Sequence, residues 1–597
     1  MSFGVSEEVI KKACELSMKA HECCDESSNY LYEECQLDST AVAVFSFAGA
    51  WSVTDLFAEN CSSYGETKID LALFPSLKSI GSQEAALVNE AFLCRFKVVF
   101  GNSSLSVKVD GAVKEQKQVV FAGHGLGGPM ANFATLWFLE KYTRIGCIAT
   151  PRCVTFGSPL VGNRILPHAV RRENWSQYFI HFVIRHDIVP CIMFAPYLSV
   201  EKELQKVLDF LNPRSVLYKN SSVFLSSEAS SFVEKVLTNL SSVASYDACN
   251  LAGCKNLLVD NFSSFMELSP YRPFGTYIFC SNNGRMVVVR NSDAVLQLLF
   301  HSSQLQSRDE CAMFAGQVLE MSLGYKDIFQ ESVEEERVIY LDSASVEFMK
   351  TEKMTLDDLG LSLKAKVCLL TAVEFEEQKL ICEKNIDKEE IIEKLNWLED
   401  YRSNCEHRKK CCYDAFRIKA DEDDFHAGVV SLQLGGMWND ILEMLKMNQL
   451  PDKFEGNKEW IELGTMYRRL AEPIAIGSYY ARGLNDDSGP FMIKGRSNVF
   501  KFTQRWLDHK EQFPVEIISE SCFWAEVEEL IILEKKKTYD GLKERIISLE
   551  RQVLHWHEAR VLESGVFFEN STFTKWWYTL PEQHKSESCI RELFSQY

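Results

Sequence analysis

The stretch Gly123–Gly128 has the spacing of the turn on which serine hydrolases carry their nucleophile. It reads Gly-His-Gly-Leu-Gly-Gly and directly follows the apolar run Val119–Ala122. In the pattern G-x-S-x-G, a Ser at the centre attacks a carbonyl while the N-terminus of the next helix stabilises the oxyanion. Here the centre is Gly125, and no Ser, Cys or Thr occurs between Phe121 and Met130. Because glycine tolerates strained turns, the sequence predicts this turn without its nucleophile.

The other members of a catalytic triad are only partly present. Asp187 follows an apolar run and precedes Ile-Val-Pro, as an orienting acid would, and the expected chain order then places a His downstream. His301 is the only His between His186 and His407, but its apolar surroundings favour a packed helix residue. His124 and His186 flank the turn and the acid and could form a polar remnant.

Two further sets of residues could do chemistry. A residual acyl hydrolase would need another nucleophile, such as Ser158, which we interpret as a turn residue after a different strand. A zinc site would use Cys405, His407, Cys411 and Cys412, but this group lacks a paired CxxC motif. Buried or incidental thiols on a helix are the favoured interpretation, so we expect no metal.

Short apolar runs that end in turn residues indicate the sheet that positions the turn. They are 41–47, 119–122, 153–156 and 182–184, with later strand-like stretches at 277–280 and 286–290. A helical stretch, 130–142, lies between the second and third runs. This alternation predicts an α/β fold in which helices cover a parallel sheet, as in α/β-hydrolases.

The second part of the chain is helical. From Ile386 apolar residues recur at helical spacing, and the acidic segment 374–385 precedes this change. We therefore predict two domains, a hydrolase-like domain at 1–380 and an all-α helical bundle at 386–597.

The overall charge limits the classes of partner. The chain of 597 residues has a formal net charge of -20, which disfavours general binding to nucleic acid or to anionic membranes. No apolar run reaches the length of a membrane span, and the N-terminus lacks the pattern of a secretory signal. We therefore expect a protein of the cytoplasm and nucleus with reduced thiols.

Longer motifs extend the argument to a known family. Thr155–Asn163 (TFGSPLVGN) and His186–Pro190 (HDIVP) resemble the class 3 lipase domain. Together with Ser269–Tyr277, Asp452–Pro473 and Tyr479–Arg496, they resemble the plant lipase-like immune regulators over nearly the whole chain. The resemblance implies heterodimers with related proteins of the phytoalexin-deficient or senescence-associated type. It also implies relay of signals from Toll/interleukin-receptor-type receptors, with helper immune receptors downstream, to basal resistance and cell death.

Two departures from the family pattern bear on catalysis. Close relatives have GHSSGG at the turn, whereas Gly125 and Leu126 stand where both serines would be. The family's third triad member aligns with 321–325, which contains no His. Only Asp187 carries over, so we expect a hydrolase-like pseudoenzyme rather than an enzyme.

The resemblance also implies a helix that inserts into a groove on the partner. The matching segment, 256–266, places four apolar residues on one helical face, namely Leu258, Phe262, Phe265 and Met266. An exposed stripe of this kind anchors a helix in a groove, but the same stripe could equally pack in the protein's own core.

The resemblance implies, finally, a cavity that the C-terminal domains form at the heterodimer junction for a ribosyl-adenylate type of messenger. Phosphates favour guanidinium and ammonium groups near aromatic rings, and the candidates are Arg482, Lys494, Arg496, Lys501 and Arg505. A second basic candidate is Arg468-Arg469, while Leu484 replaces a cation of close relatives. A solvated basic face, on a scaffold without a ligand, is the alternative. Lys535-Lys536-Lys537 is either a weak nuclear-entry signal or a solvated helix end.

Overall fold

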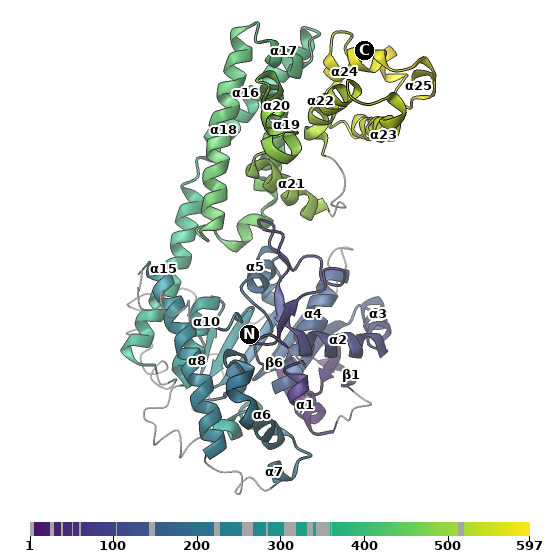
Figure 1. Cartoon of the computed structure of the whole chain (residues 1–597). Helices are drawn as coiled ribbons and strands as arrows, with labels where there is room; N and C mark the ends of the chain where they lie inside the picture. The colour runs from purple at the N-terminus through teal and green to yellow at the C-terminus, as the bar shows by residue number, and fades with distance from the viewer. Residues whose placement is uncertain are drawn as a thin grey trace. The chain divides into compact units, whose positions relative to one another are not determined.

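The protein divides into two compact units, Met1–Gln378 and Lys379–Tyr597, in the computed structural model shown in Figure 1. The structure describes residues 5–23, 29–37, 40–49, 52–58, 61–102, 104–142, 150–219, 227–253, 267–281, 285–303, 318–330, 338–341, 359, 361–511 and 519–596. The boundary lies within one helix, α15 (Leu363–Lys384), and not in a loop. The acidic segment 374–385 that marks the change of character is therefore mostly helical.

Unit 1 is built on an eight-stranded sheet in the order β1-β2-β5-β6-β7-β8-β9-β10. Its strands are β1 (Tyr30–Leu37), β2 (Thr40–Phe47), β5 (Gln118–His124), β6 (Pro151–Phe156), β7 (Phe179–Ile184), β8 (Thr276–Cys280), β9 (Met286–Val289) and β10 (Val338–Tyr340). A separate two-stranded sheet joins β3 (Glu66–Lys68) to β4 (Leu87–Asn89). The structure confirms the predicted α/β-hydrolase class.

The expectation of a parallel sheet is confirmed for the central strands and wrong for two strand pairs. The strands from β2 to β8 pair in parallel, but β1 pairs antiparallel with β2, and β9 pairs antiparallel with β8. Both antiparallel pairs join strands that are separated by short connections, which suit a hairpin and are too short for a crossover helix.

Both faces of the sheet are buried, because alternate residues of each strand enter two different hydrophobic cores. Phe45 and Phe121 enter one core, while Val44 and Val120 enter the other. This double burial explains why the central strands are continuous apolar runs. The second core is closed by α1 (Glu7–Cys23) and α12 (Tyr325–Gln330).

The first core is closed by helices from the rest of unit 1. They are α2 (Glu90–Asn102), α4 (Gly128–Tyr142), α6 (Tyr197–Leu211), α8 (Ser227–Leu251) and α10 (Ser292–Ser303), with α3 (Leu105–Lys114) and α5 (Ile165–Arg172) beside them. Because α4 is buried on almost every side, its helical periodicity is weak even though its apolar content is high.

Unit 2 is all-helical, as predicted. Its longer helices are α16 (Lys388–His407), α18 (Glu422–Lys446), α19 (Lys458–Ala481), α21 (Asn498–Glu511), α22 (Phe523–Glu534) and α23 (Lys543–Glu558), and its shorter ones include α17 (Cys412–Ile418), α24 (Thr572–Thr579) and α25 (Glu582–Glu587). Side-chain caps explain where the long helices begin. Asp421 and Asp424 form a capping box before α18, and Asn457 caps α19.

Aromatic side chains fill the interior of unit 2. The rings of Tyr413 and Trp524 are stacked with centroids 4.1 Å apart, and Trp438 makes edge contacts with Trp460 and Trp506. Helices α16 and α18 lie side by side (Figure 1). Among the described helices of both units, none combines the length and the apolar character needed to cross a bilayer.

Candidate functional site: a hydrolase turn without its nucleophile

The turn predicted from the glycine pattern is present between a strand and a helix. Strand β5 ends at His124, one short helical turn spans Gly125–Gly127, and α4 begins at Gly128. Gly125 has φ +49°, and a Cβ atom added there would meet nothing within 4 Å. The turn therefore keeps space for a side chain, and backbone strain alone disfavours one.

The neighbouring glycines are required for a different reason. A Cβ on Gly127 would overlap the carbonyl oxygen of Phe47, and one on Gly128 would overlap the hydroxyl of Ser158. These close approaches let the turn pack against the ends of β2 and β6. The frame of the turn is thus built by glycine packing and does not depend on a catalytic side chain.

Asp187 lies where the orienting acid is expected, but a tyrosine is its partner. The hydroxyl of Tyr325 donates to Asp187 Oδ2 at 2.6 Å, and the Val189 amide donates to Oδ1 at 3.0 Å. Tyr325 begins α12, at the end of the segment in which the family's histidine is expected. Burial raises the pKa of Asp187 to about 7, although these hydrogen bonds lower it.

His124, which directly precedes Gly125, is fully engaged on both ring nitrogens. Its Nε2 lies 2.5 Å from the carbonyl oxygen of Ser322, so Nε2 carries the hydrogen and donates. In the neutral ring Nδ1 must then accept, and it lies 3.2 Å from Nδ1 of His21 on α1. Burial lowers the pKa of His124 to about 4, which keeps the ring neutral. When His21 carries its hydrogen on Nδ1 and donates it across this contact, His124 has no free lone pair to act as a general base.

The alternative catalytic residues are also committed elsewhere. The hydroxyl of Ser158 donates to the carbonyl oxygen of Pro159 at 3.1 Å. His301 lies on α10 and is 5% exposed within the first core. His186 has φ +69° at the end of β7, and burial lowers its pKa to about 4. The turn thus keeps the position of a hydrolase turn between a strand and a helix, while Asp187, His124 and Ser158 each contact a partner outside a catalytic triad.

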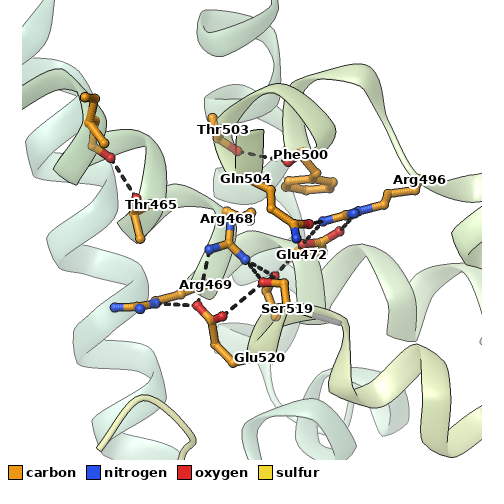
Figure 2. Close-up of polar contacts among 12 residues, drawn as sticks. Thr465, Arg468, Arg469, Glu472, Arg496, Phe500, Thr503, Gln504, Ser519 and Glu520 are labelled. Atoms are coloured by element: carbon orange, nitrogen blue, oxygen red, sulfur yellow. Dashed lines mark hydrogen bonds and ion pairs between the residues drawn. The ribbon is translucent and has the colours of Figure 1, made fainter. Parts of the chain in front are cut away.

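A second candidate site lies inside unit 2, where α19 and α21 meet the start of α22 (Figure 2). Arg496 donates to Glu472 through Nε at 2.6 Å and to Gln504 through Nη2 at 2.6 Å. The side chains of Arg496 and Glu472 are 9% and 0% exposed, respectively. Of the predicted ligand residues, Arg496 is therefore an interior group that already holds a carboxylate.

The predicted pair Arg468-Arg469 belongs to the same network. Arg468 contacts Ser519, Ser521 and Glu520, and Arg469 Nε donates to Glu520 at 2.6 Å (Figure 2). Ser521 then donates to Glu472 at 2.6 Å, which links the two halves. Burial alone would raise the pKa of Glu520, but the two arginines hold it at about 2.

Arg505 gives this network, which we name the arginine cluster, a surplus of positive charge. The cluster consists of Arg468, Arg469, Arg496 and Arg505 with the carboxylates of Glu472 and Glu520. Burial and the charge of Arg496 both lower the pKa of Arg505. Among the described residues, Arg505 Nε has no hydrogen-bond partner. Asp508 also acts on Arg496, where its charge helps to raise the pKa of the guanidinium, so four guanidinium groups lie among three carboxylates.

Other predicted residues lie apart from this cluster or outside the described residues. Arg482 is exposed at the end of α19, Lys494 is exposed in the turn before α21, and Lys501 is half-buried on α21. The predicted partner stripe, at Leu258, Phe262, Phe265 and Met266, lies outside the described residues.

The cysteines that were considered as zinc ligands bond to other side chains. The Cys411 thiol donates to Glu563 at 3.1 Å, and Cys405 and Cys412 share a hydrogen bond. Among the residues that the structure describes, no group of three His, Cys, Asp or Glu residues is arranged to hold a metal ion.

Several partners could not be read from the sequence pattern. Tyr325 and His21 lie far along the chain from Asp187 and His124, and neither forms a motif with its partner. Glu472 follows Arg468 by four residues, which suggests a direct pair on one helix face. In the structure Ser521 links them instead, because its hydroxyl accepts from Arg468 and donates to Glu472. Only the fold brings Glu520 to the arginines.

Comparison with known proteins agrees with this layout. Residues 44–197 match the class 3 lipase profile, and residues 396–593 match the enhanced disease susceptibility 1 protein EP domain. The chain is 37% identical to protein EDS1 of Arabidopsis thaliana over 93% of each chain. It is 23% identical to lipase-like PAD4 of the same plant, over 85% of this chain and 83% of that one.

Solved lipases are more distant. The Lip2 lipase of Yarrowia lipolytica is 17% identical, covers 31% of this chain and 72% of its own, and has a TM-score of 0.24. The full-length relatives, in contrast, match both units in order. The chain therefore belongs to the enhanced disease susceptibility 1 family of plant lipase-like immune regulators.

Proposed function

We propose that this protein is a non-catalytic regulator of plant immune signalling that has kept the hydrolase frame and lost hydrolysis. The observation that carries the proposal is Gly125 at the apex of the turn, with the lone pair of His124 bonded to His21 and Asp187 bonded to Tyr325. Serine hydrolysis needs a nucleophile, a base and an acid in one chain of hydrogen bonds. Loss of the nucleophile alone lowers turnover about 10⁶-fold in a serine hydrolase.

Purified protein tests this part directly. We expect no hydrolysis of p-nitrophenyl esters and no labelling by a fluorophosphonate probe, with an active serine lipase as the positive control. Hydrolysis that Asp187→Ala abolishes, or labelling that Ser158→Ala abolishes, would instead support a residual acyl hydrolase.

The regulator is proposed to act as a heterodimer with related lipase-like proteins of the PAD4 or senescence-associated type. In this role it relays signals from Toll/interleukin-receptor-type receptors through helper immune receptors to basal resistance and cell death, in cytoplasm and nucleus. The sequence supports the pairing through the apolar stripe formed by Leu258, Phe262, Phe265 and Met266.

Co-expression with PAD4 tests the proposed heterodimer. We expect co-elution on size exclusion, lost in Phe262→Glu and kept in Glu228→Gln, a change at a half-buried residue of α8 that pairs with Lys206. Co-elution of Phe262→Glu would refute the stripe as the anchor.

The arginine cluster supports the third part, binding of a nucleotide-derived messenger of the ribosyl-adenylate type. Its surplus positive charge matches phosphate groups, which bind guanidinium pairs strongly. Mass spectrometry of nucleotides that co-purify with the heterodimer tests this. We expect a bound nucleotide with native protein and none with Arg505→Gln, while the dimer still forms. Arg496→Ala should also lose it, but would leave Glu472 buried and unpaired. Normal signalling by both variants would favour a scaffold without a ligand.

A further inference from the structure

A groove in unit 2 lies between the end of α22 and one face of α24. Ile531, Glu534 and Lys535 form one wall, and Thr572, Lys575, Trp576 and Thr579 form the other. Its volume is about 530 Å³, which exceeds the space of any single side chain. It is separate from the arginine cluster and from the hydrolase turn, since none of its lining residues belongs to either.

The floor of the groove is apolar and fixed. Trp576 is only 6% exposed, and its indole Nε1 donates to Glu534 Oε2 at 3.1 Å. That bond orients the ring and engages the only carboxylate of the groove. Ile531 is half-buried beside it. A bulky apolar side chain that entered the groove would be desolvated against this floor, which is a favourable contact.

The rim of the groove is basic. Lys535 and Lys575 lie on opposite walls, and Lys536 and Lys537 continue the run from α22. All four lysines are exposed, and none of the carboxylates that the structure describes forms an ion pair with them. In a chain with a net charge of -20, these four lysines outnumber Glu534, the one carboxylate of the lining, and form a local reversal of charge. Because charges are screened beyond about 10 Å, a short ligand in the groove is affected mainly by these lysines.

The length of the groove indicates the shape of its ligand. Thr572, Lys575, Trp576 and Thr579 follow the helical spacing i, i+3, i+4 and i+7 along α24. Seven residues of helix rise by about 10 Å, or two turns. A second helix laid along this face would present a matching two-turn stripe, flanked by its own polar positions.

We propose that the groove between α22 and α24 binds an acidic amphipathic helix of another protein, with its apolar stripe on Ile531 and Trp576 and its carboxylates toward Lys535 and Lys575. This mode of recognition places a helix in a groove and uses charge to fix its orientation. It does not depend on the proposed messenger or on the heterodimer.

Two other polyanions fit the groove less well. A membrane surface would need an apolar side chain that protrudes, whereas Trp576 is largely buried. Nucleic acid presents phosphates over a long surface and would meet the acidic remainder of the chain. A short acidic helix avoids both difficulties.

The test is a selection of 16-residue peptides from a random phage-displayed library on the full-length protein. Each enriched peptide is then measured on the native protein and on the double variant Lys535→Glu/Lys575→Glu. We expect the enriched peptides to carry Asp or Glu around a Leu, Phe or Trp pair spaced three or four residues apart. Their affinity for the double variant should fall at least fivefold, the effect expected for losing two surface ion pairs.

Lys543→Glu is the control, because it makes the same Lys-to-Glu change, at one site in place of two, on an exposed residue at the start of α23 outside the groove. It should bind the peptides like the native protein. Thermal melts would show that all variants are folded. The proposal is overturned if the selected peptides are basic or neutral, if no peptide distinguishes the double variant, or if Lys543→Glu weakens binding equally. Binding of phosphatidylserine vesicles that requires Lys535 and Lys575 would overturn it in favour of a membrane.

Discussion

At the scale of single residues, the sequence predicts what the turn has lost but not what replaced it. Gly125 and the absence of a histidine in 321–325 are visible in the chain itself. The bond between Tyr325 and Asp187 and the contact between His21 and His124 are not visible, because each joins residues more than 100 positions apart. Long-range pairs of this kind depend on the packing of α1 and α12 on the sheet.

Restoring the nucleophile should not restore the enzyme. We expect Gly125→Ser to fold, since a side chain there meets nothing within 4 Å, at a cost of about 1 kcal/mol for its positive φ. Turnover of p-nitrophenyl butyrate should stay at background, because neither His124 nor Asp187 is free to activate the hydroxyl. Turnover well above background, lost again in His124→Ala, would show that the base is available.

Asp187 should make stability depend on pH. Its pKa is about 7 in the folded chain, whereas an unfolded Asp binds its proton only below about pH 4. Between these values the folded state holds a proton that the unfolded state lacks, so the free energy of unfolding falls as pH rises, by about 1.4 kcal/mol per unit. Relative to Asp187→Asn, native protein should lose roughly 2–3 kcal/mol from pH 5 to pH 7 in urea titrations. Parallel curves for the two proteins would contradict this.

At the scale of elements, periodicity predicted the buried strands and the helical second unit. It missed β1, whose residues alternate between partly exposed and exposed positions because it lies at the sheet edge. It also treated the antiparallel pair β8 and β9 as part of a parallel sheet, since burial on both faces makes the two arrangements look alike in sequence. The domain boundary was placed in a segment that proves to be helical, because charge and helix formation are compatible.

Two glycines of unit 1 should respond to alanine in opposite ways. In Gly127→Ala the new methyl group overlaps the backbone of Phe47, so we expect a loss of about 3 kcal/mol or more in the free energy of unfolding. In Gly111→Ala, on α3, the methyl group meets nothing within 4 Å, and helix propensity should add up to about 1 kcal/mol. Chemical denaturation of both variants measures the difference. Equal changes in the free energy of unfolding would mean that the backbone of the turn can shift to accept the methyl group.

At the scale of the whole molecule, each unit has its own core, and damage in one should be separable from damage in the other. The Glu472→Gln change keeps the shape of the side chain but removes a charge buried between Arg496 and Ser521. Breaking a buried pair in this way costs about 3–5 kcal/mol.

We therefore expect calorimetry of the native protein to resolve two transitions. Glu472→Gln should lower only the transition of unit 2, and Gly127→Ala only that of unit 1. A single transition that moves with both variants would show that the units unfold together.

Helix α1 has a practical consequence for anyone who shortens this gene. Its residues Val9, Ala13 and Leu16 seal one side of the central strands, and its last turn supplies the imidazole that meets His124. An N-terminal helix of this length often looks dispensable, yet removing α1 would expose the apolar residues of the central strands to water. Variants that lack α1 should therefore aggregate during expression. Loss of activity of such a variant in plant assays would reflect misfolding and not a role of α1 in signalling.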